Sequence, residues 1–236
     1  MAVNINTVYQ RVLAIANKEQ RGYITPQEFN LLANQAQLDI FEQYFYDLNQ
    51  FSRLPGNETR YADMVDIIEE KISVFEKFRQ DVSMSAGGVG TLPANTHKLG
   101  AVSYNTGSGY VEIEHINQNE LNKYINSPLT APTKTRPIYI KTSETAIQVY
   151  PTTITSAVTC NYIAKPATAR WGYTIVNDRP LYNSGTTYTT HFELHESEET
   201  DLVINILSLA GIVIKDISLY QAAKQEDIQE IQQEKL

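Results

Sequence analysis

The sequence predicts an α+β protein: an N-terminal helical bundle, a central antiparallel β-sandwich or barrel, and C-terminal helices that pack back on the bundle. Apolar residues recur with the helical period before residue 85 and after residue 195, and with a period of two between them. The 236 residues, 42% of them hydrophobic, suffice for a substantial core. We therefore expect a helical part over residues 1–84, a β domain over 85–195, and completing helices over 196–236.

Two N-terminal helices are indicated by apolar spacing and by a capping sequence. The first has its apolar face at Ile5, Val8, Val12 and Ile15. Before the second, Thr25 is placed as N-cap, Pro26 occupies the first helical position, and Glu28 can reach back to the cap. This helix should run from Pro26 to Phe51, a length of about 39 Å at 1.5 Å per residue.

The helix from Pro26 to Phe51 carries two apolar stripes. A surface helix needs only one, so the second must be covered by the rest of the chain or by a neighbouring subunit. We expect an oligomer interface at Leu31, Leu38, Phe41 and Phe45.

A third helix follows, with a core face from Tyr61 to Phe75, and the glycine-rich residues 85–90 are the expected boundary with the β domain. Within that domain, residues 105–109 and 143–145 are expected to be hairpin connections. A short helix is expected over residues 118–126.

The last helix begins among acidic residues, which favour a helix N-terminus, and its apolar face continues to Tyr220. The longest apolar run, residues 202–214, is shorter than the roughly 20 residues that a membrane span needs. The polar tail from Gln221 has only two apolar anchors. We expect docking to a portal or another ring through Tyr220, Ile228 and Ile231.

The charge and the amino-acid composition argue against several classes of function. The net charge of −8 argues against affinity for bare nucleic acid, which relies on Lys and Arg. A single cysteine, Cys160, allows neither an intrachain disulfide nor a Cys-based zinc site, and its strand-like surroundings predict a small buried hydrophobe. The N-terminus lacks the pattern of a signal peptide, so we expect a soluble chain made in a reducing compartment.

Two patterns resemble metal sites. Residues 17–28 mimic a calcium loop, but Arg21 would place a cation at a ligand position, so a helix–glycine–helix joint is expected. His191, Glu193 and His195 alternate on one strand face, where side chains run parallel and rarely converge on one ion. We expect no metal and no cofactor.

Catalytic patterns are missing as well. Residues 85–90 lack the Lys-Ser/Thr of a phosphate loop, and no nucleophile elbow or matched acid and base is found. We therefore expect no enzymatic activity. Trp171 is read as a packed aromatic capping the sandwich, with a stacking platform as the other reading. The fifteen tyrosines are compatible with interfaces.

Four stretches carry a resemblance to a known family, the head-to-tail connector or adaptor proteins of short-tailed bacteriophages (podoviruses), which include tail tubular protein A and the ring proteins of crAss-like phages. Residues 8–13 and 23–30 are similar to its paired helices, and residues 92–102 to its entry into the sheet. Residues 136–151 and 161–166 resemble its central β signature. Residues 209–220 resemble its closing helix.

The resemblance implies a structural virion protein, a ring of commonly twelve subunits that docks beneath the portal, contacts adjacent tail proteins, and lets DNA pass through its centre. It implies assembly in the bacterial cytoplasm and no catalytic residues. The alternative reading is a β-sandwich module that recognises a carbohydrate or a protein partner, for which Tyr-rich loops and Trp171 would be suited.

Overall fold

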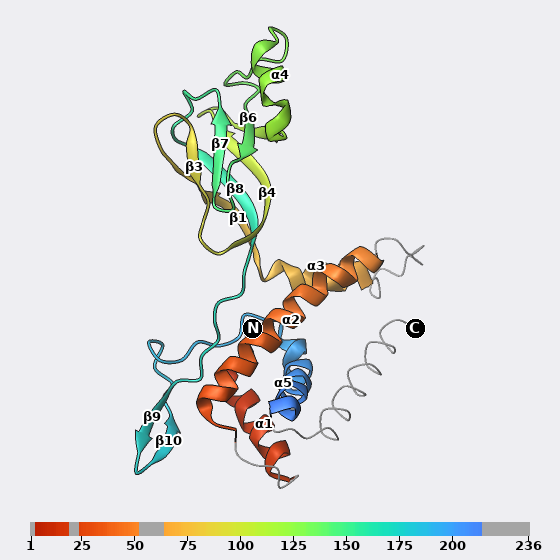
Figure 1. The fold of residues 1–236 in the computed structure, drawn as a ribbon, viewed down its shortest axis with the longest axis vertical. Helices are drawn as coiled ribbons and strands as arrows, with labels where there is room; N and C mark the ends of the chain where they lie inside the picture. The colour runs from red at the N-terminus through yellow and green to blue at the C-terminus, as the bar shows by residue number, and fades with distance from the viewer. Residues whose placement is uncertain (1–2, 19–23, 52–63, 214–236) are drawn as a thin grey trace. The chain divides into compact units, whose positions relative to one another are not determined.

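The computed structural model describes residues 3–18, 24–51 and 64–213, and it has the α+β class that the sequence predicts. The chain divides into two compact units (Figure 1). The helical unit combines Met1–Val74 with Pro166–Leu236, and the β unit is Phe75–Lys165.

Among its described residues, the helical unit contains the α-helices α1 (Ile5–Lys18), α2 (Pro26–Phe51), α3 (Met64–Ser73) and α5 (Glu199–Val213). Helix α2 packs against α3 and α5, and α5 also packs against α1. The apolar face predicted for the first helix is buried at Ile5, Val8 and Val12, whereas its fourth residue, Ile15, is 39% exposed. The described part of the C-terminal region therefore packs back on the N-terminal helices, as expected.

Helix α2 begins where the capping box predicts. Glu28 accepts a hydrogen bond from the Thr25 N–H at 2.9 Å, and the Glu28 N–H donates to Thr25 Oγ1 at 3.3 Å. The backbone hydrogen bond and that from the Thr25 hydroxyl lower the pKa of Glu28. Its carboxylate thus caps the helix, as expected if residues 17–28 form a joint between two helices.

Amide side chains on α2 bind the backbone of a distant segment in the same unit. Asn34 donates to the Ala169 carbonyl and accepts from the Ala169 N–H, both at 2.8 Å. Asn30 bonds the two backbone groups of Trp171 in the same way, at 3.3 and 2.7 Å. Gln37, one turn further along, donates to the carbonyl of residue 167 at 2.8 Å.

The spacing of these bonds matches a helix to an extended chain. Four helical residues rise about 6 Å, and two extended residues advance about 6.6 Å, so Asn30 and Asn34 meet Trp171 and Ala169 in register. Arg170, which lies between Ala169 and Trp171, instead forms an isolated antiparallel β-bridge with Thr190. The segment after Pro166 therefore belongs to the helical unit, whereas the sequence placed it in the β domain.

A two-stranded hairpin completes the helical unit. Strands β9 (Tyr173–Val176) and β10 (Arg179–Tyr182) pair antiparallel around a two-residue turn. Both turn residues, Asn177 and Asp178, have positive φ (49° and 60°), as a type I′ turn requires. The hairpin extends away from the helices of its unit (Figure 1).

The β unit is an eight-stranded sheet that curves into a nearly closed barrel (Figure 1). Its strands are β1 (Glu76–Asp81), β2 (Ser83–Met84), β3 (Val89–Thr91), β4 (Thr96–Asn105), β5 (Tyr110–His115), β6 (Ile138–Lys141), β7 (Ala146–Tyr150) and β8 (Val158–Ala164). Their order across the sheet is β1-β8-β4-β5-β6-β7-β3-β2. The expected hairpin connections after β4 and β6 are confirmed by antiparallel pairing of the strands they join.

One pair of strands departs from the predicted antiparallel arrangement: β5 and β6 run parallel. The connection between them carries the 3₁₀ turn η1 (Gln118–Glu120) and helix α4 (Leu121–Asn126), where the sequence predicts a short helix. Parallel neighbours need such a crossover, because a tight turn would reverse the chain direction.

The barrel closes because one continuous segment serves both edges of the sheet. Strands β1 and β2 stand at opposite ends of the strand order, yet only Val82 separates them along the chain. Val82 is buried, and its N–H donates to the Val158 carbonyl at 2.9 Å. Residues 76–84 thus pair with β8 at one end and β3 at the other, so the sheet leaves little open edge.

The barrel interior is filled by apolar side chains from its strands and loops. Cys160 lies among them as predicted, 1% exposed, and burial raises the pKa of its thiol to about 11. The cluster comprises Val82, Leu92, Val102, Ile113, Tyr139, Ile147, Val149, Ile154, Val158, Cys160, Tyr162 and Ala164.

The glycine-rich residues 85–90 are a hairpin turn inside the β unit rather than its boundary. They join β2 to β3, and Gly87 and Gly88 have φ of 81° and 79°. A Cβ on Gly88 would lie 2.5 Å from the Val149 carbonyl oxygen, so close approach of strand β7 requires glycine there. The units divide instead between Val74 and Phe75.

Candidate functional site

The outward face of α2 exposes part of the interface predicted from the sequence. Leu31 is 74% exposed and Leu38 is 42% exposed. Phe41, in contrast, is 1% exposed and packs edge-to-face with the half-buried Phe45, their centroids 5.0 Å apart. Phe41 therefore belongs to the core and is removed from the predicted interface, because the second stripe is covered by the chain at that point.

The residues predicted to dock a portal or a further ring, Tyr220, Ile228 and Ile231, lie outside the described residues.

The hairpin β9–β10 is a second exposed apolar surface. Ile175 is 70% exposed, and Val176 and Leu181 are about half exposed. Ile175 pairs across the hairpin with Pro180, whereas Leu181 pairs with Thr174, so apolar side chains stand on both faces. No sequence pattern indicates that this hairpin leaves the main sheet.

A groove of about 570 Å³ separates the hairpin from α1. Trp171 is one of the residues that line the groove, and it is buried, with its indole N–H donating to Asn6 Oδ1 at 3.0 Å. Its ring stacks with those of Tyr173 and Tyr182, at 5.8 and 5.6 Å between centroids. Trp171 is thus a packed aromatic, as expected, but it anchors the hairpin in the helical unit and does not cap the sandwich.

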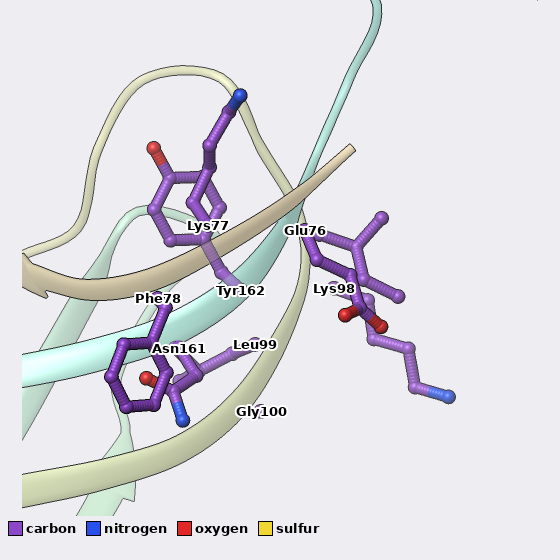
Figure 2. Close-up of a pocket in the computed structure, with 9 residues that line it drawn as sticks. Glu76, Lys77, Phe78, Lys98, Leu99, Gly100, Asn161 and Tyr162 are labelled. Carbon is purple, nitrogen blue, oxygen red and sulfur yellow. The ribbon is translucent and has the colours of Figure 1, made fainter. Parts of the chain in front are cut away.

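The β unit has a hollow of about 320 Å³ on the outside of its sheet, where two bulges face one residue (Figure 2). On β1, Phe78 and Arg79 together oppose Asn161 of β8. On β4, Gly100 and Ala101 oppose the same residue. Such double bulges bend both strands away from β8 and open the surface between them.

Side chains around this hollow, here termed the Asn161 hollow, are mixed in character. Figure 2 shows the ring of Phe78 and the side chains of Leu99 and Asn161 together beside Gly100, while the ammonium groups of Lys77 and Lys98 point away from them in different directions, that of Lys77 on the side of Tyr162. The hollow is lined by Glu76, Lys77, Phe78, Lys98, Leu99, Gly100, Asn161, Tyr162 and Ile163.

Arg79 extends this site toward the start of β5. Its backbone is in the left-handed region (φ 50°), a conformation that costs a non-glycine residue about 1 kcal/mol or more. The Arg79 N–H donates to Asn161 Oδ1 at 2.9 Å, which holds the bulge. The guanidinium carbon lies 4.8 Å from the ring centroid of Phe78 and 4.0 Å from that of Tyr110, within cation–π range.

The three groups proposed from sequence as a weak metal pattern have separate partners. His191 Nδ1 accepts from the Ile5 N–H at 3.4 Å, and Glu193 accepts from the backbone of residue 167 at 2.8 Å. His195 Nδ1 accepts from the Ser197 N–H at 3.3 Å and caps the 3₁₀ turn η2 (Glu196–Glu198). Within the described residues, no group of three or more His, Cys, Asp or Glu could hold a metal ion.

A buried ion pair ties α3 to η2. Lys71 Nζ lies 2.7 Å from Glu198 Oε1, and the Glu198 side chain is 4% exposed. Tyr44 of α2 is buried beside them, with its ring 5.9 Å from the Lys71 ammonium. Burial, together with the negative charges of Glu198 and Asp201, raises the pKa of Tyr44 well above its usual range. Since this cluster joins three elements in the core of the helical unit, its role is to hold them together.

Comparison with models of known protein families finds no match to this chain, and comparison with curated protein sequences finds none either. Of the helices in the described ranges, none is both long enough and apolar enough to cross a bilayer.

Proposed function

We propose that this chain is a structural virion protein, a ring-forming head-to-tail adaptor that joins the portal of a short-tailed phage to its tail and surrounds the DNA channel. Its place would be the portal vertex of the virion, after assembly in the bacterial cytoplasm. The role is architectural and non-catalytic. The sequence resemblance suggests it, and the distribution of apolar surface in the structure supports it.

The observation that carries the proposal is the hairpin β9–β10. An isolated two-stranded hairpin is marginally stable in water, yet this one exposes Ile175, Val176 and Leu181. Exposed apolar side chains gathered in one protrusion mark an interaction surface. Contact with a neighbouring subunit would bury them and hold the hairpin.

A ring also needs a second, different surface on each subunit. A contact between unlike surfaces closes into a ring when its rotation divides a full turn. The outward face of α2, with Leu31 and Leu38 exposed, is a second apolar surface, separate from the hairpin, that is available for contact with another subunit. The helical unit therefore offers two apolar surfaces for subunit contact.

Sedimentation velocity of the purified chain tests the proposal. The wild type should sediment as one large oligomer of about twelve subunits, the number that the resemblance implies. The Ile175→Asp variant should sediment as a smaller species, because a carboxylate in a closed apolar interface is strongly disfavoured. Thr153→Asp makes the same charge change at an exposed position of the β unit, outside the hairpin and α2, and is the matched control that should assemble like the wild type.

The portal is the partner that this role requires. Adding purified portal protein should give a complex with the oligomer, and deletion of residues 221–236 should prevent it. Unchanged attachment of the deleted chain would contradict docking through Ile228 and Ile231. A wild-type chain that stays monomeric at all concentrations, with or without portal, would contradict the adaptor proposal itself.

A further inference from the structure

The Asn161 hollow and its neighbouring side chains form a basic and aromatic cluster. Lys77 and Lys98 line the hollow, and Arg79 is held against Phe78 and Tyr110. Within the described ranges, no carboxylate forms an ion pair with any of these three cations. Cations without an ion-pair partner among the described residues, together with the exposed rings of Phe78 and Tyr110, indicate a surface that receives a ligand bearing both negative charge and apolar groups.

The exposure and the backbone conformation of residues in this cluster also indicate a binding role. Phe78 lines the hollow, yet its large apolar ring is not buried in it and remains 67% exposed. Arg79 keeps a left-handed backbone that a regular strand would avoid. Strain and bulges of this kind are common where a strand must re-aim a side chain for function. Arginine and aromatic residues are also those that most often dominate protein–protein contacts.

The chemistry favours a protein surface over a nucleic acid. Nucleic-acid binding rests on neutralising successive phosphates along a backbone, whereas this cluster has three cations and carries Glu76 within the hollow itself. A depression of about 320 Å³ beside Phe78 and Leu99 is suited to an apolar side chain. The expected occupant therefore has apolar side chains with carboxylates beside them.

The outward face of α2 has those properties. Helix α2 contains four carboxylates and no Lys or Arg. Leu31 and Leu38 lie two turns apart on its exposed face, and Asp39 and Glu42 are exposed within about one turn of Leu38. This face, here termed the acidic face of α2, is complementary to the hollow in charge and in apolar character.

We propose that the Asn161 hollow, with Lys77, Arg79 and Lys98, binds the acidic face of α2 from a second copy of this chain. Each subunit then offers an acidic helix on one unit and a basic hollow on the other, which is a contact between unlike surfaces. The inference rests on the proposed ring assembly and identifies one of its contacts. Complementary charge of this kind fixes the register of an interface and selects the partner.

A pair of charge-reversed variants tests the contact. K77E/K98E reverses the hollow, and D39K/E42K reverses the acidic face. Each variant alone should lose self-association, with the apparent Kd rising at least about tenfold, because like charges then face each other. An equimolar mixture of the two should regain wild-type assembly with equal amounts of each chain. Recovery on mixing also shows that both variants are folded.

K123E/K134E is the matched control. It makes the same charge change at two exposed lysines of the β unit that lie away from the hollow, and it should assemble like the wild type. If the wild type forms rings and K77E/K98E forms them equally well, the inference is overturned and the adaptor proposal stands. If the wild type stays monomeric, both are contradicted.

A nucleic acid is the competing occupant, and a short DNA duplex added at physiological salt is its probe. We expect no difference in duplex binding between the wild type and K77E/K98E. Binding that is lost in this variant, with self-association unchanged, would assign the cluster to nucleic acid and overturn the inference.

Discussion

Asn34 of α2 holds both backbone groups of Ala169, with its amide nitrogen 2.8 Å from the carbonyl oxygen and its amide oxygen 2.8 Å from the backbone nitrogen. The two residues are 135 positions apart in the sequence. A single side chain of the helix thus provides the two hydrogen bonds to the Ala169 backbone that a neighbouring strand would otherwise provide. It secures the start of the segment that carries Trp171 and the β9–β10 hairpin, and so it positions the surface on which the proposed assembly depends.

Replacing Asn34 with alanine should lower the free energy of unfolding by about 2–3 kcal/mol. The two hydrogen bonds to Ala169 are lost together with the one that the Asn34 amide donates to the Asn30 carbonyl, and the backbone polar groups of the buried Ala169 are left without these partners. Urea unfolding measures the change. Gln35→Ala, at the next position on the exposed side of the same helix, is the control and should cost less than about 0.5 kcal/mol. Equal losses in the two variants would show that Asn34 does not hold the segment.

The raised pKa of Tyr44 predicts a loss of stability at high pH. The buried hydroxyl stays protonated while the same tyrosine ionises in the unfolded chain near its ordinary pKa of 10.0, so stability is full below that pH and declines above it. Between pH 9 and 10.5 the wild type should lose about 0.8 kcal/mol more than Tyr44→Phe.

Urea unfolding at the two pH values provides this measurement. Tyr46→Phe removes the hydroxyl of an exposed tyrosine two positions away and should follow the wild type. Parallel pH profiles for Tyr44→Phe and the wild type would contradict the role given to burial.

The chain's single thiol should be inert while the protein is folded. With a pKa of about 11, only about one Cys160 in a thousand is a thiolate at pH 8, and the side chain is buried in the barrel. Modification by a chromogenic disulfide reagent should be at least about a hundredfold slower in native than in urea-unfolded protein. Fast stoichiometric labelling of the native chain would show that the barrel opens or that Cys160 is accessible.

Alanine substitutions at Gly88 and Gly107 distinguish the cost of backbone strain from the cost of steric overlap. Both have positive φ, so an alanine at either position should cost about 1–2 kcal/mol. At Gly107 a Cβ meets nothing within 4 Å, whereas at Gly88 it would lie 2.5 Å from the Val149 carbonyl oxygen. Gly88→Ala should therefore cost at least about 1 kcal/mol more than Gly107→Ala in thermal unfolding. Identical costs would mean that strand β7 yields readily at this turn.

Local patterns predicted the helices well. The capping box at Thr25 and Glu28 placed the start of α2, and apolar spacing identified the buried face of α1 except at Ile15, because both signals depend on residues within two turns of each other. The exposure of Leu31 and Leu38 was also consistent with the second stripe. The burial of Phe41 was not predictable, because it depends on which elements pack over the far half of the helix.

Features that depend on pairing between residues far apart in the sequence could not be predicted from it. The unit boundary near residue 166 follows from amide–backbone bonds between α2 and a segment more than 100 residues away, and three scattered amides on a helix give no sequence signal. The Asn161 hollow depends on bulges in two strands, and neither Arg79 nor Gly100 indicates a bulge without the register of β8. The parallel β5–β6 pair likewise depends on the path of the crossover.

Electron microscopy of the purified chain in negative stain, at high protein concentration, tests the central claim most directly. The adaptor proposal predicts uniform closed rings with an open centre, and predicts that Ile175→Asp abolishes them while the control Thr153→Asp does not. Monomeric particles at every concentration, with portal protein present as well as absent, would contradict it.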